Sequence, residues 1–319
     1  MAHNFEFAVR MTRLRASLMV ALLFTLAACN STDSLTENIV TDPEVADEGA
    51  AVEEVGDAEF SSSRFSGGIP FGTAGHPNTS FGSEFNGGLR IIGPKWLLKD
   101  LAAIRARGGR VVINFAGGQP RFTDRRGHFS LKMWKASVDR FKNINFSSYI
   151  KDGTIIGHFL LDEPTDRSNW RGTLVSQATI DEMARYSKQR WPKMATIIRA
   201  EPRQVKWSKR YKHLDAAWAQ YVHRKGNAND FIRRNISDAR SMGLGLVVGL
   251  NLLKGGPGGR RMTASQVSSY GSALLNSTYP CAFLSWQYSG SYLKNRAIKN
   301  AVRTLRAKAR NRGQTSCRG

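Results

Sequence analysis

The sequence predicts a (β/α)8 barrel, because apolar runs and amphipathic stretches alternate over about 260 residues, close to the length that such a barrel needs. The most informative run covers residues 154–161. It lacks the polar–apolar alternation of a half-exposed strand, which is typical of a parallel strand covered on both faces. The run ends at Asp162, Glu163 and Pro164, and proline cannot donate to a strand ladder. This strand therefore brings two carboxylates to one end of the barrel.

The other elements are predicted in the same way along the chain. A helix at 94–107 has Pro94 in its first turn and stops before Gly108 and Gly109, as helices commonly do. Seven strands are clear, and the eighth is the short run 89–92. An open doubly wound sheet is the alternative, but no Gly-x-Gly-x-x-Gly turn follows a first strand. The predicted strands are 67–72, 110–115, 154–162, 194–199, 213–221, 244–252 and 282–288, and the further helices are 131–141, 146–151, 179–190, 229–242 and 264–275.

The N-terminal segment has the order of a secretory signal: Arg10, Arg13 and Arg15, then the apolar run 18–24, then small residues. This apolar run is too short for a permanent transmembrane helix. Residues 26–29, Leu-Ala-Ala-Cys, resemble the lipobox of bacterial lipoproteins. The resemblance implies cleavage after residue 28, acylation of Cys29, and an exported protein anchored by lipid to the bacterial cell envelope. An ordinary signal peptide with a chance cysteine is the alternative.

Composition divides the rest of the chain at about residue 60. Residues 30–60 contain ten acidic residues and no Lys, Arg, Trp or Tyr. Such a segment cannot bury a core, so residues 29–60 are predicted to be an acidic disordered tether. Residues 61–319 are the predicted barrel domain.

The barrel domain is strongly basic. Residues 61–319 hold 44 of the 47 basic residues and 14 of the 25 acidic ones, a net charge of about +30. This excess favours attraction to a polyanion, such as an anionic polysaccharide or another cell-surface polymer. Many of the charges fall in a predicted helix at 294–312, where a solvated helix face is the simpler explanation. No nucleic-acid motif is present, and export argues against that partner.

The cysteines agree with export. With Cys29 assigned to lipid, Cys281 and Cys317 remain, and in an oxidising compartment they form a candidate disulfide that ties the C-terminal tail to the last strand. Two reduced thiols are the alternative. Cys and His show no metal-site spacing, and we expect neither a metal nor a cofactor.

The carboxyl ends of the strands are where barrel enzymes carry their reactive groups. In this chain they supply acids, amides and aromatic side chains, a combination that suits a sugar site because aromatic faces stack on sugar rings and amides bind hydroxyls. The predicted substrate-binding residues are Asn114, Trp170, Trp218, Gln220, Asn251, Trp286 and Tyr288, with Trp170 as a substrate platform in a rim loop.

The strand ending Gly157-His158-Phe159-Leu160-Leu161-Asp162-Glu163-Pro164 and the last strand, Phe283-Leu284-Ser285-Trp286-Gln287-Tyr288, resemble those of TIM-barrel glycoside hydrolases. The resemblance implies that Glu163 is the general acid. It also implies a carboxylate nucleophile on a late strand, but those strands end at Asn251 and Gln287, neither of which can attack a sugar. Among the remaining acids, Glu201 is the best distant partner for Glu163.

Adjacent Asp162 and Glu163 also resemble the acid pair of hexosaminidase-type glycosidases. That resemblance implies that Asp162 orients the substrate's acetamido group, which itself attacks, while Glu163 protonates the leaving oxygen. Neighbouring residues of a strand point to opposite faces, however. On that rule one carboxylate only caps a helix or pairs with Arg167 or Arg199.

The sequence thus predicts an exported, lipid-anchored glycoside hydrolase-like protein that acts on a carbohydrate polymer. The alternative is a non-catalytic barrel that binds an anionic polymer of the cell surface through its basic charge. The oligomeric state is not predicted.

Overall fold

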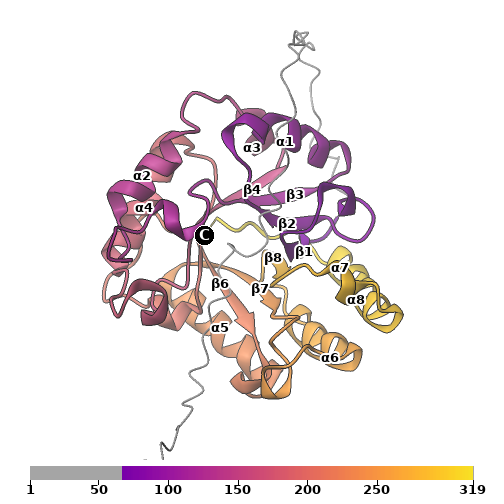
Figure 1. Ribbon diagram of the computed structural model, residues 1–319. Helices are drawn as coiled ribbons and strands as arrows, with labels where there is room; N and C mark the ends of the chain where they lie inside the picture. The colour runs from indigo at the N-terminus through magenta and orange to yellow at the C-terminus, as the bar shows by residue number, and fades with distance from the viewer. Residues whose placement is uncertain (1–66, 319) are drawn as a thin grey trace, which may run out of the picture. The chain divides into compact units, whose positions relative to one another are not determined.

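The computed structural model describes residues 67–318, which form a closed barrel of eight parallel strands in sequence order. Figure 1 shows the strands at the centre and the helices around them. The predicted (β/α)8 barrel is confirmed, including its eighth, short strand. The strands are β1 (Phe71–Ala74), β2 (Gly87–Arg90), β3 (Arg110–Ile113), β4 (Ile155–Asp162), β5 (Thr196–Arg199), β6 (Ala216–Tyr221), β7 (Gly245–Leu250) and β8 (Ala282–Ser285).

The ring of helices is irregular. Only a short 3-10 helix lies between β1 and β2, namely η1 (Asn78–Ser80), and likewise η5 (Pro202–Val205) between β5 and β6. The last connection contains two helices, so β8 is followed by α7 and α8. The helices are α1 (Leu97–Ala106), α2 (Leu131–Asp139), α3 (Ser147–Lys151), α4 (Gln177–Arg190), α5 (Ala228–Met242), α6 (Ala264–Leu275), α7 (Gly290–Leu293) and α8 (Arg296–Arg310).

The barrel has two apolar cores. One fills the space inside the strands and includes Phe159 and Trp218, whose rings meet edge to face. The other lies between the strands and the helices and includes Leu161 and Ile198. Together they bury both faces of each strand, which is why the strand sequences read as continuous apolar runs.

The C-terminal tail packs against the end of the barrel at which the strands begin. Cys317 forms a disulfide with Cys281, which directly precedes β8, and both belong to the inner core. The backbone of Cys317 also packs against Gly245 at the start of β7. In Figure 1 the tail reaches the ring of strands. The last helix is thereby tied to the barrel at both of its ends.

Strand β4 contains a β-bulge that changes which face its last residues occupy. Phe159 pairs with Ile197 and Leu161 with Ile198, so Leu160 is an extra residue. Simple alternation places Leu161 inside the barrel, but Leu160 and Leu161 both lie in the outer core. The bulge therefore turns Asp162 towards the interior side of the barrel's mouth.

Buried histidines predict a loss of stability in acid. Burial lowers the pKa of His158 from 6.5 to about 3, and that of His76 from 6.5 to about 4. Below pH 6.5 the unfolded chain binds more protons than the folded one, so the unfolding free energy falls as the pH falls. We expect a slope of up to about 1.4 kcal/mol per pH unit from each histidine. Urea unfolding between pH 6.5 and about 4 measures it.

The matched variants are His158→Gln and His76→Gln, because both histidines are fully buried. Each variant should remove one histidine's share of the slope. An unchanged slope in His158→Gln would show that the buried His158 does not cause the loss of stability in acid.

The predicted signal segment, Cys29 and the predicted tether to residue 60 lie outside the described residues. Within residues 67–318, no helix combines the length and the apolar character needed to cross a membrane.

Candidate functional site

The carboxyl ends of β4 and β5 bring a carboxylate pair and an arginine together. Asp162 is the last residue of β4, Glu163 follows it, and Arg199 ends the neighbouring strand β5. Glu163 has a backbone φ of 38°, in the left-handed region that residues other than glycine rarely adopt. The chain therefore leaves the extended conformation at Glu163, and both adjacent carboxylates reach the same guanidinium. Such strained positions are common at functional sites.

Arg199 is the centre of the site's contacts. Its Nε and Nη2 donate to the two carboxylate oxygens of Asp162, with Nη2 to Oδ2 at 2.8 Å. The same Nη2 lies 3.6 Å from Oε1 of Glu163, and Nη1 donates to Oε1 of Gln220 at 3.4 Å. The guanidinium stacks 4.2 Å from the ring centre of Trp286. A bidentate guanidinium–carboxylate pair fixes geometry as well as charge, so Asp162 is held rigidly.

Glu163 combines exposure with a raised pKa. Its side chain is 41% exposed, against 7% for Arg199. Partial burial raises the pKa of Glu163 above its ordinary value; the negative charges of Asp162 and Asp166 raise it further, while Arg199 lowers it. Nδ2 of Asn169 lies 3.5 Å from its Oε2. A carboxyl that keeps its proton above the usual carboxyl range and remains accessible can serve as a general acid.

Glu201 occupies a different environment from the one expected of a catalytic partner. It is buried, with its side chain only 6% exposed, and directly precedes η5. Nζ of Lys225 lies 2.8 Å from its Oε1, and Nε of Arg203 lies 3.6 Å from its Oε2. Glu201 is thus ion-paired with a partly exposed lysine, and its role as the distant partner of Glu163 stays a prediction.

The three predicted amide residues form hydrogen bonds with loops and strand ends at the mouth of the barrel. Asn114 is buried, and its amide exchanges two hydrogen bonds with the backbone of Gly117, at 2.9 and 3.1 Å. Gln220 bridges Arg199 and the carbonyl of Leu284. Asn251 accepts from the backbone of Lys254 at 2.9 Å. These contacts position loops and strand ends, and Asn251 is the most accessible of the three predicted amides.

Two of the predicted aromatic residues lie below the surface. Trp170 is only 2% exposed because it packs against Phe122 and Phe129. Trp218 is fully buried inside the barrel, where its Nε1 donates to the carbonyl of Leu284. Neither ring is open to a substrate, so the predicted platform at Trp170 must be corrected. Although the loop after β4 lies at the rim, the ring of Trp170 packs inward against apolar side chains instead of facing the solvent.

Two other aromatic residues stay at the mouth. Trp286 lies under the guanidinium of Arg199 and pairs with Asn251 through the backbone. Its side chain is only 2% exposed, as little as that of Trp170, so its predicted contact with a substrate must also be corrected. Tyr288 is partly exposed, and its ring centre lies 6.5 Å from that of His76. Tyr288 is therefore the predicted aromatic side chain most available for stacking on a sugar.

Trp170 forms a hydrogen bond with the backbone of Glu163. Its Nε1 donates to the backbone carbonyl of Glu163 at 3.1 Å. Trp170→Phe keeps the packing but removes this bond, and we expect it to lower the unfolding free energy by about 1 kcal/mol and to shift the pKa of Glu163. Urea unfolding and a carbon-13 NMR titration of the carboxyl measure the two effects.

Trp134→Phe is the matched control, because the Nε1 of Trp134 donates to the carbonyl of Leu160 at 2.9 Å, elsewhere on β4. It should cost similar stability and leave the pKa of Glu163 unchanged. Equal titration curves for both variants would contradict a positioning role for Trp170.

Sequence reasoning did not assign Asp166 or Lys225 to the site, and it named Arg199 only as a strand-end residue and an ion-pair partner for one carboxylate. Arg199 was within reach of prediction, since it ends the strand that follows the acid-bearing one and the ends of parallel strands meet at one edge. Asp166 lies in a loop and Lys225 ends the 3-10 helix η6 (His223–Lys225), and the approach of such connecting segments to a strand end is not visible in the sequence.

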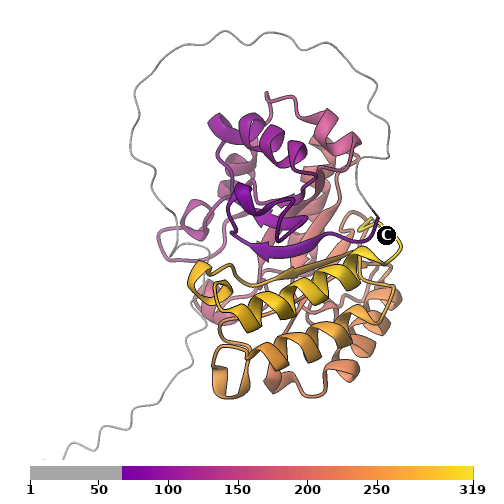
Figure 2. The same ribbon diagram turned by 90° about the vertical axis from the view of Figure 1, so that its right-hand side faces the viewer.

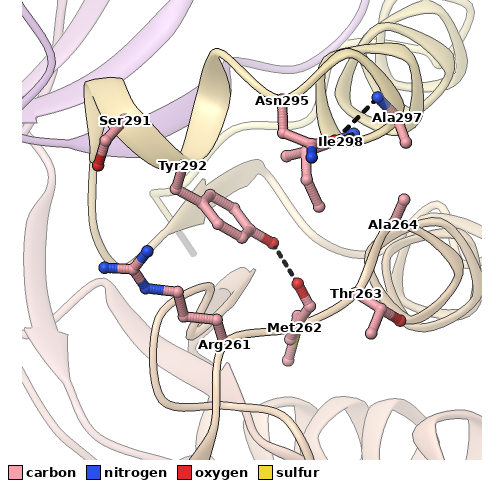
Figure 3. Close-up of a pocket in the computed structure, with 9 residues that line it drawn as sticks. All are labelled: Arg261, Met262, Thr263, Ala264, Ser291, Tyr292, Asn295, Ala297 and Ile298. Atoms are coloured by element: carbon pink, nitrogen blue, oxygen red, sulfur yellow. Dashed lines mark hydrogen bonds between the residues drawn. The ribbon is translucent and has the colours of Figure 1, made fainter.

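A cavity of about 430 Å³ lies apart from these residues, between the segment that precedes α6 and the helices α7 and α8. Figure 3 shows Tyr292 reaching across it, with its hydroxyl donating to the carbonyl of Met262 at 2.8 Å. Thr263 and Asn295 at its edge cap α6 and α8. None of its lining residues is a predicted site residue. Among residues 67–318, no group of three or more His, Cys, Asp or Glu side chains could hold a metal ion.

Fold and site together define a (β/α)8 barrel with an accessible carboxyl at its mouth. No protein-family model matches the chain, and neither does any curated protein. Among solved structures, the chain is similar to an exo-β-1,4-mannosidase from Opitutaceae bacterium strain TAV5, with a TM-score of 0.51 and 14% identity over 76% of this chain. The match spans 60% of the mannosidase chain.

Two further matches have lower TM-scores. A GH18 chitinase from Pseudoalteromonas aurantia matches at a TM-score of 0.47 and 8% identity, over 75% of this chain and 99% of the chitinase. A D-psicose 3-epimerase matches at 0.44 and 13%, over 76% of this chain and 98% of the epimerase. Other glycoside hydrolases recur among the matches. At these identities the similarity shows the barrel fold and does not define a reaction.

Proposed function

We propose that this protein is a glycoside hydrolase acting on a carbohydrate polymer, with Glu163 as its general acid. One observation carries the proposal: Glu163 is the accessible member of a carboxylate pair at the mouth of the barrel, and its environment raises its pKa. Glycoside hydrolysis needs a carboxyl that is protonated at working pH and can reach the glycosidic oxygen. The glycoside hydrolases among the fold neighbours share this architecture.

The arrangement favours a mechanism that uses Asp162 rather than Glu201. Asp162 is adjacent to Glu163, and the bidentate contact with Arg199 holds its carboxylate in a fixed orientation. In this position it can orient a polar substituent of the sugar next to the reacting carbon, such as an acetamido group that attacks in place of a protein nucleophile. Glu163 then donates its proton to the leaving oxygen. Glu201, buried against Lys225, takes no direct part.

The protein is further proposed to be exported and anchored by an acyl chain on Cys29, with residues 29–60 as a tether. The signal-like order of residues 10–29 supports this proposal. The disulfide between Cys281 and Cys317 adds support, because disulfides persist in oxidising compartments outside the cytosol.

The non-catalytic polymer-binding barrel stays as a second candidate because of one observation. Within residues 67–318, the two carboxylates expected to assist Glu163 are both ion-paired, Asp162 with Arg199 and Glu201 with Lys225. A binding protein needs no unpaired second carboxylate.

A polysaccharide panel separates the two candidates. The full chain is incubated with neutral, acetamido-containing and acidic polymers, and both binding and the release of new reducing ends are measured. The proposed function predicts that reducing ends accumulate with at least one polymer. Binding without any release of reducing ends would favour the non-catalytic barrel.

A further inference from the structure

Helix α8 carries a line of five cations along one face. Its basic residues at 296, 299, 303, 306 and 310 follow each other at alternating spacings of three and four, and the helix contains no acidic residue. This spacing places side chains along a single face. The adjoining face, with Ile298, Val302 and Leu305, is buried against the protein. Figure 2 shows α8 lengthwise on the outside of the barrel, beside α6.

Folding alone does not account for the whole of this line. Like charges at spacings of three and four repel each other and weaken a helix. A basic residue at the first helical position, Arg296, also opposes the helix dipole, and no acid in the first turn compensates. Surface helices usually relieve such repulsion with interspersed acids. Helix α8 contains no such acid, so the repulsion between its cations can be relieved only by groups outside the helix.

The five cations are of two kinds. Lys299 lies 3.5 Å from Glu84, and the guanidinium of Arg306 donates to the carbonyls of Gly82 and Ser83, so both are used within the fold. Within the described part of the chain, the other three, Arg296, Arg303 and Arg310, form no ion pair with an acidic side chain, and all three are exposed.

These three arginines are spaced by seven residues, or about two helical turns, which sets them about 10 Å apart along one edge. That interval is close to the length of a disaccharide in an extended polysaccharide. The intervening exposed residues are small or polar: Ala297, Asn300, Thr304 and Ala307. They offer no aromatic ring on which a base could stack and no apolar wedge for a bilayer.

We propose that α8 is a binding surface for a linear acidic polysaccharide, separate from the barrel's mouth. Arg296, Arg303 and Arg310 contact carboxylates or sulfates on successive repeats of the polymer. Guanidinium groups suit this role because their planar fork binds such anions in a bidentate manner. This surface holds a polymer against the outside of the barrel, and it operates whether or not the mouth is catalytic.

The test uses the full chain and polygalacturonate, with neutral galactan as the uncharged counterpart. The variant Arg296→Gln/Arg303→Gln/Arg310→Gln removes the line. The control Arg125→Gln/Arg126→Gln/Arg260→Gln removes the same charge from exposed arginines of other loops. We expect the α8 variant to lose about tenfold or more in polygalacturonate affinity at low salt, with a shallower salt dependence. The control should lose less than about threefold.

The melting temperature verifies that both variants fold, and it should rise slightly in the α8 variant because repulsion is removed. Equal losses of affinity in the two variants would overturn the proposal in favour of general charge attraction. It would also be overturned if the α8 variant lost binding mainly to phosphatidylglycerol vesicles or to duplex DNA, or if the wild type bound galactan as well as polygalacturonate.

Discussion

Replacing Glu163 by glutamine is expected to lower polysaccharide turnover by about 10²–10⁴-fold, the usual contribution of a general acid. Glutamine has the size of glutamate but no proton to donate. Because the Glu163 side chain is 41% exposed, the variant should fold normally and still bind the polymer. Initial rates of reducing-end release, with binding measured in parallel, give the two effects.

Glu84→Gln is a closely matched control. Its side chain is 40% exposed and lies 3.5 Å from Lys299, much as Glu163 lies 3.6 Å from Arg199. It should keep wild-type turnover. If Glu163→Gln kept wild-type turnover as well, Glu163 could not be the acid.

Turnover should also depend on pH through Glu163. Only the protonated form donates, so the rate falls as the pH rises through the pKa of this group. Because that pKa is raised, the decline lies at higher pH than for an ordinary carboxyl.

Replacing Arg199 by methionine is expected to cost about 2–3 kcal/mol of unfolding free energy. The substitution leaves Asp162 without its bidentate partner, and removing one member of a buried ion pair is strongly destabilising. The value is set at the low end because the Asp162 side chain is 24% exposed and water screens part of the charge. Arg199→Lys keeps the positive charge but loses the bidentate guanidinium contact, so it should lower the unfolding free energy by less. Urea unfolding measures both losses.

The same substitution has a distinct effect on Glu163. Arg199 lowers the pKa of Glu163 and Asp162 raises it. Arg199→Met should therefore move the pKa of Glu163 up, and Asp162→Asn should move it down. Carbon-13 NMR titration of the Glu163 carboxyl detects both shifts. Shifts in the same direction would contradict the proposed electrostatic arrangement.

The sequence predicted the barrel well because burial on both faces marks parallel strands strongly. The run 154–161 and the helix stop at Gly108 both depend on local chemistry, and both agree with β4 and α1. The first strand was predicted at 67–72 and lies at Phe71–Ala74, since glycines and a proline blur its boundaries.

The site was harder to predict because its geometry depends on departures from regular structure. The extra residue in β4 and the left-handed backbone at Glu163 reverse the alternation that separates neighbouring side chains. Neither leaves a signal in the sequence. The burial of Trp170 and the pairing of Glu201 with Lys225 depend on contacts between distant segments.

The central claim is that Glu163 protonates the leaving oxygen, and the leaving group itself tests it most directly. Wild type and Glu163→Gln are compared on two glycosides of the sugar identified by the panel. One carries a dinitrophenyl group, which departs without a proton, and the other an alkyl group, which needs one. The proposed role predicts a large loss of kcat/KM on the alkyl glycoside and a small loss on the dinitrophenyl glycoside. Equal losses on the two substrates would contradict it.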